Sequence, residues 1–270
     1  MPFIHRIDPI LLSFGPFRVA WYGIMYLISF TLGYLLLKRN YYKKGVDITL
    51  AHYDSFFYSI VFGVFIGARL GFVLFYHPEY YLANPLEIIY IWQGGLSFHG
   101  GLIGVIIASL LFCRKYKYNF YTLADPAMPL VALSIGFVRI GNFINGELYG
   151  SVTNLPWAVV FANTDPLLLP RHPSQIYESL LEGFLMSIFL QIMLFKTKIS
   201  GMIFWLFIGC YGVVRFLVEF IRLPDDLIYY ENGMILGFFS LGQLLSLFMI
   251  ISFLIAATVY GIRRNQVSNK

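Results

Sequence analysis

The sequence predicts an all-α, polytopic membrane protein with about seven transmembrane helices. Of its 270 residues, 59% are hydrophobic and only 12% are charged, which excludes an ordinary soluble domain. Apolar runs of roughly 17–25 residues recur along the chain, and each is long enough to cross a hydrocarbon core of about 30 Å. The expected spans are approximately 19–37, 56–76, 96–113, 123–143, 176–195, 202–221 and 235–260.

The placement of Lys and Arg predicts the topology. Connections on one side of the expected spans carry four of these residues, and connections on the other side carry twelve. Because the richer side faces the cytoplasm, we expect the N-terminus outside and the C-terminus inside. This asymmetry accounts for the net charge of +5 without a nucleic-acid partner.

Residues 1–270 are expected to form a single integral membrane domain with no cleavable signal peptide. An interfacial arm after the second span and a small periplasmic head, built mainly from the outer loop 144–175, are expected to project from it. The two cysteines, Cys113 and Cys210, lie in or at the end of spans, which predicts neither a disulfide framework nor a metal site. We expect no cofactor.

The first two spans carry packing and anchoring signals. Tyr22 opens span one beside Trp21, as an aromatic belt would, and simple interfacial anchoring is an alternative for it. Span two carries Gly63, Gly67 and Gly71 at four-residue spacing, a row that permits close helix contact.

The segment before span three is aromatic and glycine-rich. Its apolar piece 86–92 is too short to cross a membrane, so we expect a helix lying in the interface. Glycine pairs at 94–95 and 100–101 then bracket His99 and predict an unwound helix start.

Span four ends in a polar stretch, residues 136–150, where Arg139, Asn142, Asn145 and Glu147 follow one another. A guanidinium at this depth costs several kcal/mol unless an anion compensates it. The glycines of the stretch are interpreted as breaks that let a phosphate approach the helix.

Spans five and six add further ionisable groups at the same expected depth. Glu178 and Glu182 lie four apart in span five, and Arg215 and Glu219 lie four apart in span six. The topology therefore brings His99, Arg139 and Arg215 toward the outer face.

Taken one at a time, each of these ionisable residues could have a purely structural role. Arg215 with Glu219, or Arg69 with Glu178, would form a structural ion pair, and His99 alone would be a packing histidine. Several ionisable groups at one depth beside glycine-rich helices favour a site instead. Two arginines suit a phosphate, and a histidine accepts a proton near neutrality, so the residues indicate an enzyme acting on a phospholipid.

Several motifs together resemble the bacterial phosphatidylglycerol–prolipoprotein diacylglyceryl transferase family. They are WYG at 21–23, SFHGGL at 97–102, RIGNFINGELYG at 139–150, LPRHPSQIYE at 169–178 and YGVVRFLVE at 211–219. The resemblance extends in order from about residue 8 to residue 262.

The resemblance implies an enzyme of the bacterial inner membrane that moves the diacylglyceryl group of phosphatidylglycerol onto the lipobox cysteine of a prolipoprotein. A thioether forms and glycerol phosphate leaves, as the first step of lipoprotein maturation. It implies catalytic roles for His99, Arg139 and Arg215, with His99 as the base. It implies substrate contacts for Arg139 and for Tyr22, Asn142, Asn145, Glu147, Gly150, His172 and Glu219.

Two other functions use the same residues. A transporter or lipid flippase would escort a headgroup with these arginines, although no clear inverted halves are visible. A phospholipid-binding structural protein would need no titrating His99.

Overall fold

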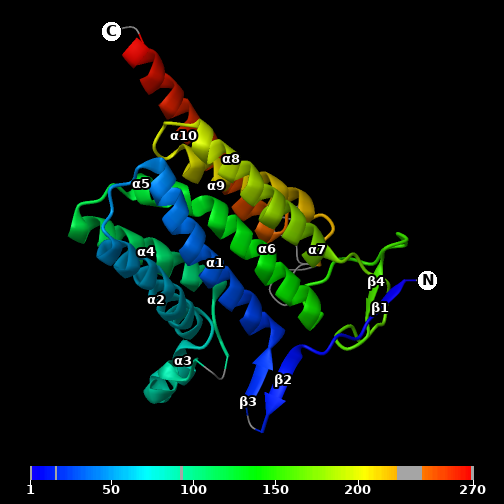
Figure 1. Ribbon diagram of the computed structural model, residues 1–270. Coiled ribbons are helices and arrows are strands. Elements are labelled where there is room, and N and C mark those ends of the chain that lie inside the picture. Colours follow the sequence, from blue (N-terminus) through cyan, green and yellow to red (C-terminus); the bar gives the residue numbers. More distant parts are fainter. Residues whose placement is uncertain (1, 16, 92–93, 224–238, 269–270) are drawn as a thin grey trace. The chain divides into compact units, whose positions relative to one another are not determined.

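The computed structural model describes residues 2–15, 17–91, 94–223 and 239–268, and side chains up to residue 260. Six described helical stretches are long and apolar enough to cross a membrane, and a shorter apolar helix, α9, accompanies them. The prediction of a polytopic α-helical membrane protein is confirmed (Figure 1). The chain contacts group into two compact units, residues 1–40 with 124–270, and residues 41–123.

The helices lie close to the expected spans. They are α1 (Trp21–Lys44), α2 (Leu50–Phe75), α4 (Phe98–Tyr116), α6 (Met128–Asn145), α8 (Met186–Lys196), α9 (Met202–Val218) and α10 (Leu241–Ser268). Shorter pieces are α3 (Pro78–Ala83), η1 (Pro85–Ile89), α5 (Phe120–Ala124), η3 (Asp125–Ala127), α7 (Ser174–Glu178) and η4 (Ser179–Leu185). The expected start of the last span at Ile235 lies outside the described residues.

In the larger unit, α6, α8 and α9 pack around an apolar core, and α10 packs on α9 (Figure 1). The core side chains come from three helices: Ala132, Met186, Leu190, Leu194, Ile203 and Phe207. Asp125 fixes the start of α9 because its carboxylate accepts the backbone N–H groups of Gly201 and Phe204, at 2.7 and 2.9 Å. Both helices start near Asp125, so the C-terminal ends of α6 and α9 lie together at the opposite end of the bundle.

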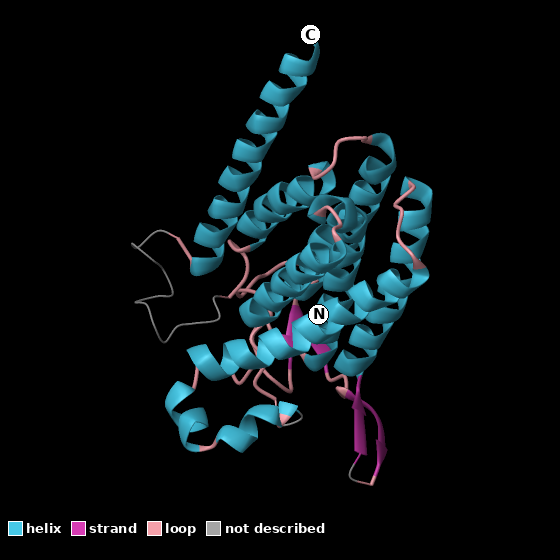
Figure 2. Cartoon of the chain, turned by 90° about the vertical axis from the view of Figure 1, so that its left-hand side faces the viewer, coloured by secondary structure: helices cyan, strands magenta, loops and turns pink. Residues whose placement is uncertain are grey.

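Two small sheets belong to the same unit (Figure 2). Strand β1 (Phe3–His5) pairs in parallel with β4 (Val159–Phe161), and this joins the N-terminus to the connection between α6 and α7. Strands β2 (Ile10–Phe14) and β3 (Phe17–Ala20) form an antiparallel hairpin that leads into α1. We call residues 146–173, which contain β4, the head.

In the smaller unit, α2 and α4 pack along their glycines. A Cβ on Gly67 would meet the backbone of Gly100 and Gly104, so the close contact predicted from the glycine row of α2 is confirmed. Gly94 and Gly95 have positive φ, whereas α4 continues as a regular helix through Gly100 and Gly101. The unwound start is thus confined to the first glycine pair.

The interpretation of residues 136–150 as a broken helix is wrong for its first half. Gly136 and Gly141 lie inside the continuous helix α6, and the helix ends only at Gly146, whose φ is 70°. These glycines serve packing: Gly136 touches Gly183 of η4, and a Cβ on Gly141 would lie 2.9 Å from Cδ2 of Tyr22. Ser179 of η4 also donates to the Gly136 carbonyl at 2.9 Å.

The Gly136–Gly183 contact gives a prediction about stability. Gly183→Ala places a methyl group against the Gly136 backbone, so α6 and η4 must separate, at a cost of about 1–3 kcal/mol. We expect a lower thermal midpoint in detergent. Gly23→Ala is the matched control, because no atom lies within 4 Å of its added Cβ. Equal midpoints for both variants would contradict the prediction.

Candidate functional site

The centre of the candidate site is the carboxylate of Glu178, the last residue of α7. Its Oε2 lies 2.7 Å from Nη2 of Arg139 on α6 and 3.2 Å from Nη1 of Arg215 on α9. The glutamate is completely buried, and the two arginine side chains are 16% and 13% exposed. Two guanidinium groups from different helices therefore meet at one oxygen atom.

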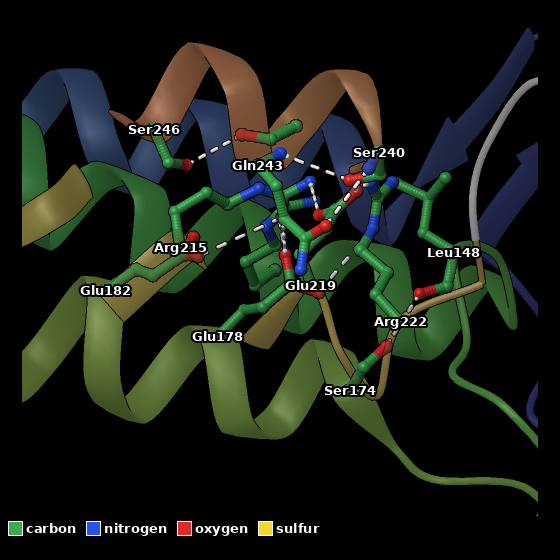
Figure 3. Close-up of polar contacts among 12 residues, drawn as sticks. Leu148, Ser174, Glu178, Glu182, Arg215, Glu219, Arg222, Ser240, Gln243 and Ser246 are labelled. Carbon is green, nitrogen blue, oxygen red and sulfur yellow. Dashed lines mark hydrogen bonds and ion pairs between the residues drawn. The ribbon is translucent and has the colours of Figure 1, made fainter. Parts of the chain in front are cut away.

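Arg215 connects this centre to the end of α9. Its Nη2 lies 2.8 Å from Oε2 of Glu219, and its Nη1 lies 3.9 Å from Oε1 of Glu182 (Figure 3). Ser240 donates from Oγ to the other oxygen of Glu219, at 3.0 Å. The ion pair between Arg215 and Glu219 exists, but it is one edge of a larger network.

Arg222 completes the network, and sequence reasoning missed it. Its Nε lies 3.9 Å from Oε1 of Glu178, and its Nη1 lies 3.9 Å from Oε2 of Glu219 (Figure 3). Arg222 follows the apolar run of α9, where the topology alone accounts for a basic residue in a connection. The available signal was its spacing, three residues after Glu219 and seven after Arg215, which is two turns of one helix face.

The predicted polar side chains after Arg139 do gather beside it. Asn142 is within 3.5 Å of Arg139 Nη1 through its Oδ1 and donates from Nδ2 to Oε1 of Glu147 at 2.8 Å. Asn145 donates to the same oxygen at 3.2 Å. The left-handed turn at Gly146 folds Glu147 back onto the helix end, so its carboxylate is held at an exposed position.

Tyr22 approaches this group from α1. Its ring lies against Gly141 of α6, two residues after Arg139 in the chain, and its hydroxyl lies 3.4 Å from that of Tyr26. The residue is half-buried, so part of its surface remains accessible.

Gly150 and His172 lie where three chain segments meet. The Gly150 N–H donates to the His172 carbonyl at 2.9 Å, and Gly150 is bridged to Arg222 in the backbone. A Cβ on Gly150 would lie 2.8 Å from Cβ of His172, so this crossing requires glycine. The His172 ring is half-buried with Nδ1 3.4 Å from the Tyr177 hydroxyl, and burial lowers the pKa of His172.

A second buried ion pair stabilises the head. Arg171 Nε and Nη2 donate to the two oxygens of Asp165 at 2.5 and 3.1 Å, and the guanidinium lies over the Tyr149 ring. The hydrogen bond from Arg171 lowers the pKa of Asp165. This bidentate pair fixes Arg171, the residue before His172, within the head.

His99 and Arg69 belong to the smaller unit. His99 is the second residue of α4, exposed, and follows the N-cap Ser97, whose Oγ accepts from the Gly100 N–H. Arg69 is buried and donates to the carbonyls of Glu87 and Ile88, at 2.7 and 2.8 Å, and to those of Gly94 and Gly95. Backbone carbonyls, not a carboxylate, thus receive the Arg69 guanidinium.

No group of three or more potential metal ligands occurs among the described residues, and Cys113 and Cys210 are free thiols. In the larger unit, Arg139, Arg215 and Arg222 form a network of ion pairs with buried glutamates. Arginines converge there with their counter-ions already in place.

The chain was compared with known proteins. The model of the prolipoprotein diacylglyceryl transferase family matches residues 9–259. The phosphatidylglycerol–prolipoprotein diacylglyceryl transferase of Geobacter sulfurreducens is 42% identical over 264 residues, covering 98% of this chain and 99% of that one. The enzymes of the same name from Bordetella avium and Vibrio cholerae are 46% and 45% identical, covering 93% and 91% of this chain and 93% and 89% of their own.

The Asp165–Arg171 pair predicts how the head responds to acid. Because the folded-state pKa of Asp165 is lowered, the pair stabilises the head fully above the ordinary aspartate value of 3.8 and is lost as the pH falls through the lower folded value. We expect the protection of the amides in residues 146–173, measured relative to the intrinsic exchange rate at each pH, to fall below that range. Asp165→Asn should exchange fast already at pH 7, and protection equal to that of the unchanged protein would contradict the prediction.

Proposed function

The chain belongs to the prolipoprotein diacylglyceryl transferase family, and from this premise we propose how its residues perform the transfer. The donor is phosphatidylglycerol, and the acceptor is the lipobox cysteine of a prolipoprotein. Arg139 and Arg215 bind the phosphate of the donor, and His99 takes the proton of the acceptor thiol.

The observation that carries the phosphate assignment is the convergence of two guanidinium groups on Glu178 Oε2, at 2.7 and 3.2 Å. A carboxylate oxygen in that position occupies the place that a phosphate oxygen would take. Arginine suits both ligands because its planar fork donates parallel hydrogen bonds and remains charged. Glu178 thus stands in for the anion of the substrate.

The reaction needs such a site because charge moves onto the phosphate. The thiolate attacks the glycerol carbon that bears the phosphate oxygen, a C–S bond forms, and the C–O bond breaks. The electron pair leaves with glycerol phosphate. Arginines that already point toward the phosphate stabilise the growing charge, an effect worth several kcal/mol in a site of low dielectric.

The cluster beside Arg139 is assigned to the glycerol of the headgroup. Glu147 is exposed and oriented by Asn142 and Asn145, so its carboxylate is ready to accept hydrogen bonds from hydroxyl groups. We assign half-buried Tyr22 to the same cluster, as a further contact of the headgroup. Gly150 and His172 position the head over this end of the bundle, and Glu219 orients Arg215.

The protein crosses the membrane several times. We assign the end of the bundle that carries Arg139 and Glu147 to the outer face of the bacterial cytoplasmic membrane, with the N-terminus outside and the C-terminus inside. The asymmetry of Lys and Arg supports this orientation. The headgroup and the translocated cysteine are then on the same side.

The arginine assignment is tested with Arg139→Lys. A point charge cannot replace the bidentate fork, so we expect kcat to fall by about 10- to 100-fold while the fold is retained. The measurement is formation of a thioether-linked diacylglyceryl peptide from phosphatidylglycerol and a lipobox peptide. Near-normal turnover would mean that Arg139 does not bind the phosphate. Failure of the unchanged protein to form the product would refute the transferase reaction.

The base assignment is tested with His99→Ala across a pH series. A free cysteine has a pKa of about 8.5, so at pH 7 the variant must work with the small thiolate fraction of the peptide. We expect strongly reduced kcat at pH 7 and recovery toward the unchanged enzyme as the pH rises past that value. A constant activity ratio at all pH values would mean that His99 does not accept this proton.

A further inference from the structure

The carboxylate of Glu178 and a substrate phosphate compete for the same place. Both need the space between Arg139 and Arg215, where Glu178 Oε2 now lies. A displaced carboxylate still requires a cation, since an uncompensated charge in a buried position is strongly destabilising. Phosphate binding therefore depends on a second position for Glu178.

Arg222 offers that position. Its Nε lies 3.9 Å from Oε1 of Glu178, an oxygen that is buried and has no hydrogen-bond partner among the described residues. A shift of about 1 Å would bring this contact to hydrogen-bond length. The carboxylate can thus reach Arg222 by a small side-chain movement.

The surroundings keep Arg222 in place for this role. Its Nη1 lies 3.9 Å from Oε2 of Glu219, and its backbone is bridged to Gly150, where the head crosses the end of α9. Its side chain is only 5% exposed. Together Glu178, Arg215, Glu219 and Arg222 form a closed ring of alternating charge (Figure 3).

We propose that Glu178 is a place-holder for the substrate phosphate and that Arg222 is its second partner. When the phosphate enters between Arg139 and Arg215, the Glu178 carboxylate transfers to Arg222, and it returns when glycerol phosphate leaves. Arg222 acts as a positioning residue that takes up the counter-ion. The inference rests on the proposed binding of the phosphate by Arg139 and Arg215.

The test is a double-mutant cycle on the KM for phosphatidylglycerol, measured with the full-length enzyme and a lipobox peptide. Arg222→Met removes the second partner, so Glu178 stays between the other arginines and KM rises about tenfold. Glu178→Gln removes the competitor, so KM falls. The double variant has no carboxylate to relocate, and its KM returns below that of Arg222→Met alone.

Arg222→Lys is the conservative control, because its ammonium still attracts the carboxylate; its KM stays within about threefold of the unchanged enzyme. If the double variant keeps the high KM of Arg222→Met, the place-holder is refuted. If Arg222→Met does not fold, Glu178→Gln decides alone, and an unchanged or higher KM overturns the proposal. Arg139→Lys in the same assay distinguishes failure of this inference from failure of the proposed phosphate site. Normal kinetics in Arg139→Lys would refute the phosphate site itself.

Discussion

The structure depends on one electrostatic constraint, the burial of the Glu178 carboxylate at the meeting point of α6, α7 and α9. Its charge is compensated by Arg139 and Arg215, and these arginines are in turn buried enough to need it. Truncating either arginine would cost about 3–5 kcal/mol, because the Glu178 carboxylate would be left without full compensation. The helix ends are thereby tied together by the same arginines that we propose bind the substrate phosphate.

The arrangement also reconciles two opposing demands on the site. Three guanidinium groups, those of Arg139, Arg215 and Arg222, would repel one another in a medium of low dielectric, so they need carboxylates nearby. A fully neutralised site, however, has little attraction for an incoming anion. Each carboxylate lies close to one arginine and slightly farther from the next, at 2.7 to 3.9 Å. This spacing compensates the arginine charges and still leaves them able to attract an anion.

Much of this was readable in the sequence. Long apolar runs predict the membrane helices because a helix satisfies its backbone hydrogen bonds within lipid. The cluster from Arg139 to Glu147 is predicted from residues that lie close together in the chain.

What sequence reasoning missed depends on contacts between distant segments. Strand β1 has only three residues and pairs with a partner more than 150 positions away, so no local pattern indicates it. Arg222 follows an apolar run, where a basic residue is ordinarily explained by topology. Gly136 and Gly141 were interpreted as helix breaks because a sequence does not show that another backbone or ring lies against them.

The π-helical turn η4 has a consequence for how this protein can vary in length. The helical stretch from Ser174 to Lys196 is fixed at two points: Glu178 meets the arginines, and Gln191 exchanges hydrogen bonds with Asn40 of α1 at 3.0 and 3.1 Å. A residue inserted into an α-helix rotates everything beyond it by about 100°. The wider turn at Ser179–Leu185 adjusts the phase between the two fixed points, so both can face their partners at once.

Deleting one residue from this turn would make the helix regular, yet either Glu178 or Gln191 would then turn away from its partner. This segment should therefore tolerate exchange of its lipid-facing side chains far better than any change in their number.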